Sequence, residues 1–223
     1  MGKKIGFIGQ GWIGKHYADD FENREQDVTR YALEEPYAQN KDKIKDCDIV
    51  FIAVPTPSVN DKFDDSILRD AISLIGEGKT AVIKSTLLPG RTELLQKDFP
   101  GIFIMHSPEF LTEATAAYDA ANPTRNIIGL PVMSDDYKEK ATEVMEVLAS
   151  APYEQICSAR EAELIKYGAN VFFFFKVIFA NMLYDLAEKK GARYDEVKEG
   201  IKHDPRIGGS HLDPIHKSGR GAG

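Results

Sequence analysis

The sequence predicts an α/β fold: an N-terminal Rossmann-type, doubly wound parallel sheet, followed by one long helix and a short helical segment. Three observations support this prediction. Short β-branched or aromatic runs alternate with helix-length segments over residues 1–155, a pattern typical of strand–helix–strand units. A glycine-rich turn, GQGWIG, follows the first apolar run. After residue 158 the alternation gives way to one long stretch with helical character.

Six apolar runs are predicted to be the strands of the sheet. Several are apolar at nearly every position, as expected when helices cover both faces of a parallel sheet. A further edge strand, Tyr153–Ile156, is predicted after the amphipathic helix Asp135–Ala149. The six runs are Lys4–Gly9, Val28–Leu33, Ile49–Val54, Ala81–Ser85, Ile102–His106 and Asn126–Leu130.

The glycine-rich turn carries the pattern GxGxxG between a strand and a helix, which is the context that a dinucleotide site requires. Gly9 permits the tight turn, Gly11 lets a pyrophosphate approach the backbone, and Gly14 lets the helix pack closely on the strand. Trp12 and Ile13 begin the helix, whose free N–H groups and positive dipole end favour an anion. The pattern predicts that NAD binds here.

A carboxylate near the end of the second strand is expected to accept the ribose hydroxyls of the cofactor. Glu34 lies 20 positions after Gly14 and fits this role. A carboxylate there disfavours the 2′-phosphate of NADP, so NAD is preferred. Arg30 and Tyr31 lie close by and keep NADP open as an alternative.

Two loops follow strands at the edge of the sheet where an open α/β fold binds its ligands. Val54, Pro55 and Thr56 follow the third strand, where proline stiffens the loop and the threonine hydroxyl is placed to meet the cofactor. Thr86, in KSTLLPG, follows the fourth strand and reaches the same edge. Each loop alone is no more than a rigid connection, and the prediction rests on their shared position.

Two pairs of polar residues are candidates for chemistry. Glu109 and Glu113 are four apart after the fifth strand, and paired carboxylates can divide acid and base roles. Lys166 and Asn170 are also four apart, on one face of the long helix. Their positive charge and amide are suited to stabilising a developing oxyanion. The alternative is that each pair is ordinary solvated surface.

The long helix is predicted over residues 158–190. Ser158 and Glu161 have capping-box spacing, and Gly191 is the stop signal. The middle, VFFFFKVIFANM, is apolar around nearly its whole circumference, so we expect a partner subunit to cover it. A purely intramolecular core helix is the alternative. A shorter helix, Tyr194–Ile201, follows, and the tail from residue 203 has no clear periodicity.

Composition narrows the class of protein. The chain has 223 residues and a net charge of −7, a poor basis for binding nucleic acid. Cys47 and Cys157 cannot form a disulfide framework, and the N-terminus is too short for a signal sequence. The apolar run Val171–Ala180 is interrupted by Lys176 and is too short to span a bilayer. We therefore expect a cytoplasmic protein with no nucleic-acid or membrane partner. No metal site is expected, because three histidines of the tail lack ligand spacing: His203, His211 and His216.

Together these segments resemble the UDP-glucose/GDP-mannose dehydrogenase family. The resemblance lies in GQGWIG, VFIAVPTP, KSTLLPGRT, SPEFLTEATAAYDAANPTRNIIG and EAELIKYGANVFFFFKVIFANMLYDLAE, and covers nearly the whole chain. It implies an NAD-binding Rossmann domain over residues 1–155 and an incomplete central helical region over residues 156–223. It also implies a homodimer through the long helix, and oxidation of the C6 alcohol of a nucleotide sugar to a carboxylate with two NAD+.

The resemblance assigns roles residue by residue. Thr86 matches a threonine that helps to hold the catalytic water, and Glu109 a glutamate proposed as the base of the hydrolytic step. Glu113 matches a second carboxylate near the cofactor. Lys166 and Asn170 match the lysine and asparagine that stabilise oxyanions and position the sugar.

Three further residues are implied to contact the substrate. Phe110 and Leu111 belong to the SPEFL segment beside the sugar. Arg206 resembles an arginine that in some members of the family reaches the substrate of the neighbouring subunit.

The sequence departs from the family pattern at its end. The segment Ser218–Gly223 resembles the glycine-rich loop that leads into a nucleophilic cysteine, and no cysteine follows. Cys47 and Cys157 do not match that position and are interpreted as structural. One hypothesis is therefore a truncated nucleotide-sugar dehydrogenase, and a second is an NAD-binding module or degenerate relative without full catalysis. A third is a hydroxyacid dehydrogenase of the 6-phosphogluconate or hydroxyisobutyrate type, which lacks the SPEFL segment.

Overall fold

A computed structural model describes residues 2–216 and 219–220 of the chain. The chain divides into two compact units, Met1–Lys166 and Tyr167–Gly223, which are described separately. The division into domains at residues 155 and 156 stays a prediction.

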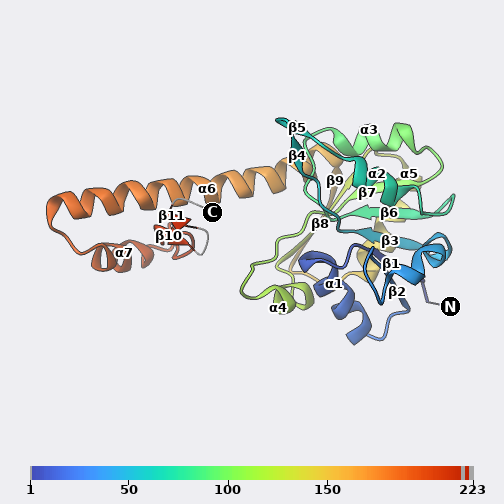
Figure 1. The fold of residues 1–223 in the computed structure, drawn as a ribbon, viewed down its shortest axis with the longest axis horizontal. Coiled ribbons are helices and arrows are strands. Elements are labelled where there is room, and N and C mark those ends of the chain that lie inside the picture. Colours follow the sequence, from blue (N-terminus) through green and yellow to red (C-terminus); the bar gives the residue numbers. More distant parts are fainter. Residues whose placement is uncertain (1, 217–218, 221–223) are drawn as a thin grey trace. The chain divides into compact units, whose positions relative to one another are not determined.

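The first unit is built on a seven-stranded sheet with the strand order β2-β1-β3-β6-β7-β8-β9 (Figure 1). The first five of these strands are parallel, as predicted, but β8 pairs antiparallel with β7, and β9 is parallel to β8. The predicted fold class is therefore confirmed, and the pairing of β7 with β8 is the one departure from a parallel arrangement among the described strands of this sheet. The strands are β1 (Ile5–Ile8), β2 (Val28–Tyr31), β3 (Ile49–Ile52), β6 (Thr80–Ile83), β7 (Phe103–His106), β8 (Arg125–Leu130) and β9 (Tyr153–Ser158).

The direction of β8 follows from the short connection that precedes it. A parallel return needs a crossover, usually a helix, that carries the chain back to the opposite edge of the sheet. Between β7 and β8 the only helix is α4 (Ala116–Ala121), which has six residues. The strand β8 therefore starts at the edge where β7 ends, with His106 opposite Gly129.

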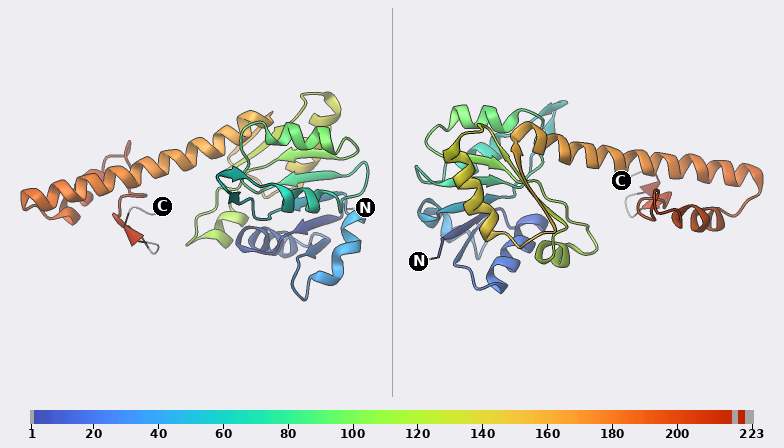
Figure 2. Two further views of the ribbon diagram at one scale, coloured as in Figure 1. Left: turned by 45° about the horizontal axis from the view of Figure 1, so that its top comes forward. Right: turned by 180° about the vertical axis from the view of Figure 1, so that it is seen from behind.

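Helices cover both faces of the sheet, which explains why β1, β3 and β6 are buried at every position (Figure 2). One buried cluster joins the sheet to α1 (Trp12–Asn23), α4 and α5 (Asp135–Val147). Its centre is three aromatic rings, Phe7, Phe21 and Phe51, with centroids 5.1–5.2 Å apart. A second cluster joins the other face to the 3-10 helix η1 (Ala38–Asp46), α2 (Ser66–Ile72) and α3 (Arg91–Asp98).

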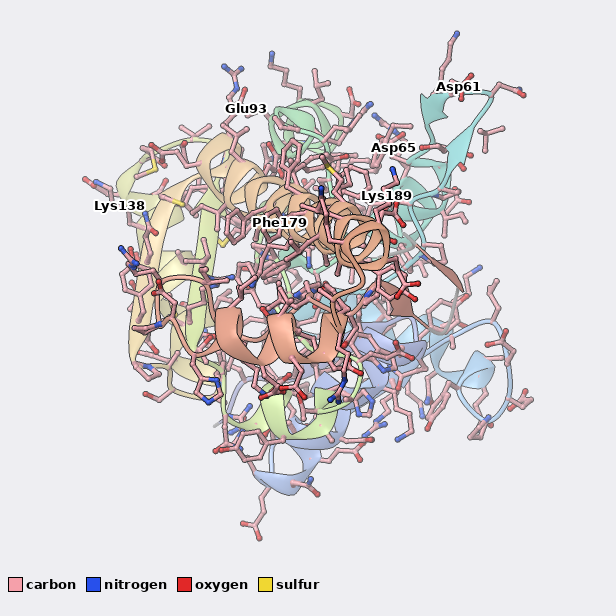
Figure 3. The ribbon with its side chains drawn as sticks, turned by 90° about the vertical axis from the view of Figure 1, so that its left-hand side faces the viewer. Asp61, Asp65, Glu93, Lys138, Phe179 and Lys189 are labelled. Atoms are coloured by element: carbon pink, nitrogen blue, oxygen red, sulfur yellow. The ribbon has the colours of Figure 1, made fainter. Side chains whose placement is uncertain are left out.

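A small hairpin, β4 (Ser58–Val59) and β5 (Lys62–Phe63), follows β3 and was not predicted. Its two turn residues, Asn60 and Asp61, have φ values of 50° and 58°. Positive φ at both central residues is the geometry that suits a two-residue hairpin turn. Figure 3 labels Asp61 at the tip of this hairpin.

The helix α6 (Ala159–Lys190) confirms the predicted long helix and both of its end signals. Ser158 and Glu161 form the capping box: the Ser158 N–H and hydroxyl each donate to Glu161 Oε2 over 2.8 Å. Gly191 has a φ of 68° and ends the helix. The first turns of α6 belong to the first unit, where buried Glu163 accepts a hydrogen bond from the Thr92 N–H over 2.9 Å.

The second unit contains the rest of α6 and a short helix, α7 (Tyr194–Lys202), close to its predicted bounds. The Tyr194 hydroxyl donates to the Leu212 carbonyl over 2.5 Å, which fixes the chain after α7. A hairpin of β10 (Ile215–His216) and β11 (Gly219–Arg220) follows. Of the predicted glycine-rich loop Ser218–Gly223, only residues 219–220 lie within the described residues.

Much of the apolar surface of α6 is exposed in this chain, and what covers it, a partner subunit or an intramolecular core, stays a prediction. Seven of its large apolar side chains are between 49% and 67% exposed: Leu164, Phe172, Phe174, Phe175, Phe179, Met182 and Leu186 (Figure 3 labels Phe179). By length and composition, α6 is also long and apolar enough to cross a membrane, which the argument from Val171–Ala180 did not anticipate. One such helix is weak evidence, because core helices of soluble proteins pass the same test.

Candidate functional site

The glycine loop has the geometry that its sequence predicts. Gly9 has a φ of 91°, and a Cβ there would lie 2.3 Å from the Ala53 carbonyl oxygen. A Cβ on Gly14 would lie 1.9 Å from the Gly9 carbonyl oxygen, so α1 can sit this close only with glycine. At Gly11 a Cβ would meet nothing within 4 Å, and Gly11 is the N-cap of α1 with no side chain capping the helix. The open, uncapped helix end fits a pyrophosphate.

The first two residues of α1 differ in their surroundings. Trp12 is 41% exposed beside the loop, with its ring edge-on to His16 at 5.9 Å. Ile13 packs against the first buried cluster. Trp12 is the single tryptophan of the chain, so its fluorescence reports on this loop.

The carboxylate expected near the end of β2 lies further from the strand than predicted. The strand ends at Tyr31 and is followed by buried Ala32, whereas the predicted Glu34 lies two residues further on and is exposed. The sequence therefore places an alanine immediately after the strand, and Glu34 would have to reach the cofactor from the loop.

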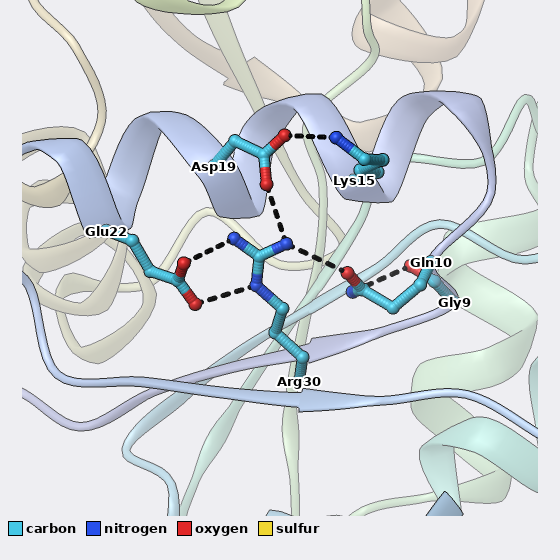
Figure 4. A network of polar contacts seen from close by, with 6 residues as sticks. All are labelled: Gly9, Gln10, Lys15, Asp19, Glu22 and Arg30. Carbon is cyan, nitrogen blue, oxygen red and sulfur yellow. Dashed lines mark hydrogen bonds and ion pairs between the residues drawn. The ribbon is translucent and has the colours of Figure 1, made fainter. Parts of the chain in front are cut away.

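Arg30 is held inside a network of acidic side chains on α1 (Figure 4). Its guanidinium donates from Nε to Glu22 over 2.7 Å and from an Nη to Asp19 over 2.7 Å. A weaker contact of 3.4 Å joins it to Gln10, the residue between the first two glycines of the loop. Because two carboxylates neutralise Arg30, the residue that kept NADP open is already occupied.

The loops after β3 and β6 are joined at the edge of the sheet. Ser85 Oγ accepts from the Val54 N–H over 3.0 Å and donates to the Val54 carbonyl over 2.6 Å. The Thr56 hydroxyl donates to the Thr86 carbonyl over 3.0 Å. The structure thus brings together the two predicted loops, with Pro55 exposed between them.

Glu109 and Lys166, 57 residues apart in sequence, form a buried ion pair. Each is 8% exposed. Lys166 Nζ donates to Glu109 Oε1 over 2.5 Å and to the Glu109 carbonyl over 2.9 Å. The other carboxylate oxygen accepts from the Leu111 N–H over 2.8 Å. An ammonium bound in this way has one proton left to direct at a ligand.

Three predicted site residues lie in other surroundings. Glu113 is exposed after the turn that carries Glu109. Asn170, one turn after Lys166 in α6, is exposed and belongs to the second unit. Arg206, also in the second unit, is exposed and paired with Asp204, with Nε–Oδ1 and Nη–Oδ2 distances of 3.0 Å and 2.6 Å.

A second buried lysine, Lys84, lies next to the Glu109 pair and was assigned no role from sequence. It is 3% exposed, and its ammonium donates to Ser107 Oγ over 3.1 Å and lies 4.3 Å from the centre of the Tyr17 ring. Burial lowers the pKa of Lys84 to about 7, against the opposing effect of the Glu109 charge. This ammonium is therefore close to the balance between its charged and neutral forms.

His106 is fully buried at the end of β7. Its Nδ1 lies 3.1 Å from the Ile83 carbonyl, and its Nε2 has no hydrogen-bond partner among the described residues. Burial lowers the pKa of His106 to about 3, and the nearby charges of Lys84 and Lys166 act in the same direction. The imidazole is therefore neutral in the folded chain.

Phe110 carries a cation on its ring. The Arg125 guanidinium carbon lies 3.8 Å from the ring centre, and Lys166 Nζ lies 5.8 Å from it. Arg125 Nε is buried and has no hydrogen-bond partner among the described residues. A buried N–H without a partner costs about 1–3 kcal/mol, so this arrangement is unfavourable in the chain alone.

Sequence reasoning missed three of these features for a common reason. The partners of Lys84, Arg125 and Arg30 come from other strands and helices, and no spacing along the chain connects them. One signal was available for Lys84, because a charged residue directly after the apolar run of β6 is unusual unless it is buried for a purpose. For Arg30, the acidic residues Asp19 and Glu22 are three apart on a predicted helix.

The sheet and its glycine loop define a dinucleotide-binding Rossmann domain. Residues 30–149 match the NAD binding domain of the UDP-glucose/GDP-mannose dehydrogenase family, and residues 160–223 match its central domain. The chain belongs to this family, and NAD is the cofactor of its first domain. The predicted family resemblance is confirmed, and the hydroxyacid dehydrogenase alternative is set aside.

Known relatives agree with this assignment. UDP-glucose 6-dehydrogenase of Rhizobium meliloti is 34% identical over 74% of this chain and 41% of its own length. That of Rickettsia bellii is 31% identical over 96% of this chain and 49% of its own length. A UDP-glucose dehydrogenase structure from Pyrobaculum islandicum superposes with a TM-score of 0.83 at 25% identity, over 95% of this chain and 59% of that one. The chain thus spans less than half of these two curated relatives.

Proposed function

We propose that the protein to which this sequence belongs oxidises the C6 hydroxyl of a nucleotide sugar, such as UDP-glucose, to a carboxylate through a bound aldehyde. The observation that carries the proposal is the buried Glu109–Lys166 pair at the same sheet edge as the glycine loop and the 54–56 and 86 loops. When bound, NAD+ would accept the hydride from C6.

The residues of this chain would then have distinct tasks. Gly9, Gly11 and Gly14 would seat the pyrophosphate, with Trp12 and Ile13 at the helix end. Val54, Pro55, Thr56, Thr86 and Glu113 would line the cofactor crevice, and Glu34 would reach the ribose. Lys166, ion-paired with Glu109, would stabilise the negative oxygen that forms when the C6 hydroxyl loses its proton. Phe110, Leu111, Asn170 and Arg206 are proposed to contact the substrate.

The second oxidation requires a nucleophile to hold the aldehyde, and neither cysteine of this sequence suits that role. Cys47 and Cys157 are both buried. Burial raises the pKa of the Cys47 thiol, and raises that of Cys157 to about 11. Thiols of this kind are poorly ionised near neutral pH and react slowly. These residues alone are therefore proposed to bind NAD+ without completing the oxidation.

The experiment is a titration of the 223-residue chain with NAD+, followed by Trp12 fluorescence, together with an assay of NADH production. The assay uses UDP-glucose, UDP-N-acetylmannosamine and GDP-mannose. We expect saturable NAD+ binding and little or no NADH. Absence of NAD+ binding would contradict the proposed cofactor site. Sustained NADH production would contradict the proposal that these residues alone do not complete the oxidation.

We also infer that a second copy of the chain covers the apolar surface of α6, through residues 158–190. The exposed aromatic side chains support this inference, because a patch of this size is costly in water. Sedimentation analysis should show a homodimer that Phe175→Glu with Phe179→Glu converts to monomer. A chain that is monomeric without these substitutions, or that partitions into lipid vesicles instead, contradicts it. The cytoplasmic location stays a prediction.

A further inference from the structure

We propose that Arg125 is the recognition residue of an oxyanion site at the carboxyl edge of the sheet, and that its ligand is the diphosphate of the nucleotide sugar. The assignment of the ligand rests on the proposed function. The site itself rests on the position, the contacts and the charge of Arg125 within the first unit.

The position follows from the antiparallel direction of β8. Since β8 starts at the edge where β7 ends, its first residue, Arg125, lies at the edge that carries the Glu109 turn. The Phe110 ring, in that turn, stacks on the guanidinium at 3.8 Å. A parallel β8 would have put Arg125 at the opposite edge, away from the site.

The contacts of Arg125 set it apart from the other arginines. Eight arginines have described side chains, and seven of them form an ion pair with a carboxylate: Arg24, Arg30, Arg69, Arg91, Arg160, Arg193 and Arg206. Arg125 is the exception among these eight. Stacking holds the plane of the guanidinium, and its buried Nε has no hydrogen-bond partner among the described residues. A flat guanidinium whose N–H groups are not taken by a carboxylate is suited to binding a phosphate or carboxylate through two hydrogen bonds.

The surrounding charge favours an anion. Lys166 lies over the same ring as Arg125, and Lys84 is buried next to Glu109. Among the described residues, Glu109 forms an ion pair with Lys166, whose ammonium occupies one of its oxygens. With Lys166 paired to Glu109, Arg125 keeps a positive charge that no carboxylate offsets by an ion pair among the described residues of this edge.

The distance from the glycine loop separates this site from the pyrophosphate of NAD. The loop follows β1, and β8 is the fourth neighbour of β1 in the sheet. Four strand spacings amount to about 19 Å. One pyrophosphate cannot reach both places, so the oxyanion at Arg125 belongs to the other substrate.

The test compares Arg125→Met, Arg125→Lys and the control Arg160→Met, an exposed arginine at the start of α6. Calorimetry measures binding of inorganic pyrophosphate, UDP-glucose and glucuronate, and Trp12 fluorescence measures NAD+ binding. For pyrophosphate and UDP-glucose, Arg125→Met should weaken binding about tenfold or more, Arg125→Lys should weaken it less, and Arg160→Met should leave it unchanged. All three variants should bind NAD+ like the parent chain.

Several results would overturn the proposal. These are equal pyrophosphate affinity in the parent and Arg125→Met, no pyrophosphate binding by the parent, or a lower melting temperature of Arg125→Met without selective loss of the anion. If Arg125→Met loses binding of glucuronate alone, the ligand of Arg125 is a carboxylate and not the diphosphate. If Arg125-dependent pyrophosphate binding persists while NAD+ or UDP-glucose fails to bind, the proposed function fails and the oxyanion site stands.

Discussion

The two units of the chain differ in how far their apolar side chains are buried. In the first unit Phe7, Phe21 and Phe51 pack in the interior, and its buried lysines and glutamates form hydrogen bonds with other groups of the same unit. In the second unit four phenylalanines of α6 are 49–61% exposed, and its polar contacts lie mostly near the surface. The first unit therefore buries its core by itself. The second unit has an exposed apolar surface, which we propose is covered by a second copy of the chain.

Substitutions should therefore act through different mechanisms in the two units. Changes within the first unit should alter its own free energy of unfolding, because each buried group depends on another group of the same unit. Changes on α6 should alter association and leave the first unit stable. Since Trp12 lies in the first unit, its fluorescence during urea unfolding separates the two.

The largest effect is expected from Lys166→Met. This change leaves the Glu109 carboxylate buried without its cation, and breaking a buried pair from one side costs about 3–5 kcal/mol. Urea unfolding monitored at Trp12 measures the loss. Glu109→Gln is the matched control and should cost less, because the amide still offers Lys166 an oxygen. Equal stability of the parent and Lys166→Met would contradict the pair as described.

Gly14→Ala should come next. Its Cβ would lie 1.9 Å from the Gly9 carbonyl oxygen, so α1 must shift, at a cost of about 3 kcal/mol. NAD+ binding should be lost with it. Gly11→Ala is the control: its Cβ meets nothing, so stability should hold while NAD+ affinity falls. If both variants behave alike, the separate roles of the two glycines are wrong.

Lys84→Met should remove a pH dependence from the first unit. Burial lowers the pKa of folded Lys84 from 10.5 to about 7, so between these values the unfolded chain binds one more proton. Stability of the parent should therefore rise with pH, by about 2 kcal/mol between pH 7 and about 8.5, and Lys84→Met should stay flat. The window stops below pH 9, because the raised thiol pKa values act with the opposite sign above it.

The choice between NAD and NADP should respond to the partners of Arg30. Asp19→Asn combined with Glu22→Gln frees the guanidinium, and NADP+ affinity relative to NAD+ should rise about tenfold, which corresponds to about 1.4 kcal/mol. Fluorescence titrations with both cofactors measure the ratio. The exposed Glu139→Gln serves as control, and an unchanged ratio in the double variant would show that Arg30 plays no part.

The smallest effect on the first unit is expected from Phe175→Ser. This side chain is 61% exposed, and surface substitutions usually change stability by less than about 0.5 kcal/mol. The Trp12 unfolding midpoint should therefore stay within error of the parent, while sedimentation should show weaker association. A large fall in the midpoint would mean that the units are not independent in this way.

Local patterns predicted the features that depend on neighbours in sequence. The glycine loop, the Ser158–Glu161 capping box and the Gly191 stop were all visible from spacings of a few residues. The direction of β8 was not visible from such spacings, because the apolar run Asn126–Leu130 predicts a strand but not whether it is parallel or antiparallel to its neighbour. Its direction depends on the length and position of the preceding connection.

The candidate site was predicted in part for a similar reason. Glu109 and Lys166 were proposed from motifs, and the structure brings them together. No local pattern indicated that Arg125 would stack on Phe110, because that contact depends on the antiparallel direction of β8. Glu34 was placed by counting from Gly14, and counting could not show that β2 would end at Tyr31, three residues earlier.

The two buried cysteines can be used to measure local opening of the first unit. Cys47 lies in the cluster beneath η1 and α2, and Cys157 lies in the small cluster at the start of α6. Each thiol can react with a labelling reagent only when its own neighbourhood opens transiently, so two modification rates report two local openings. Mass spectrometry of both sites would show whether cofactor binding slows the first rate alone.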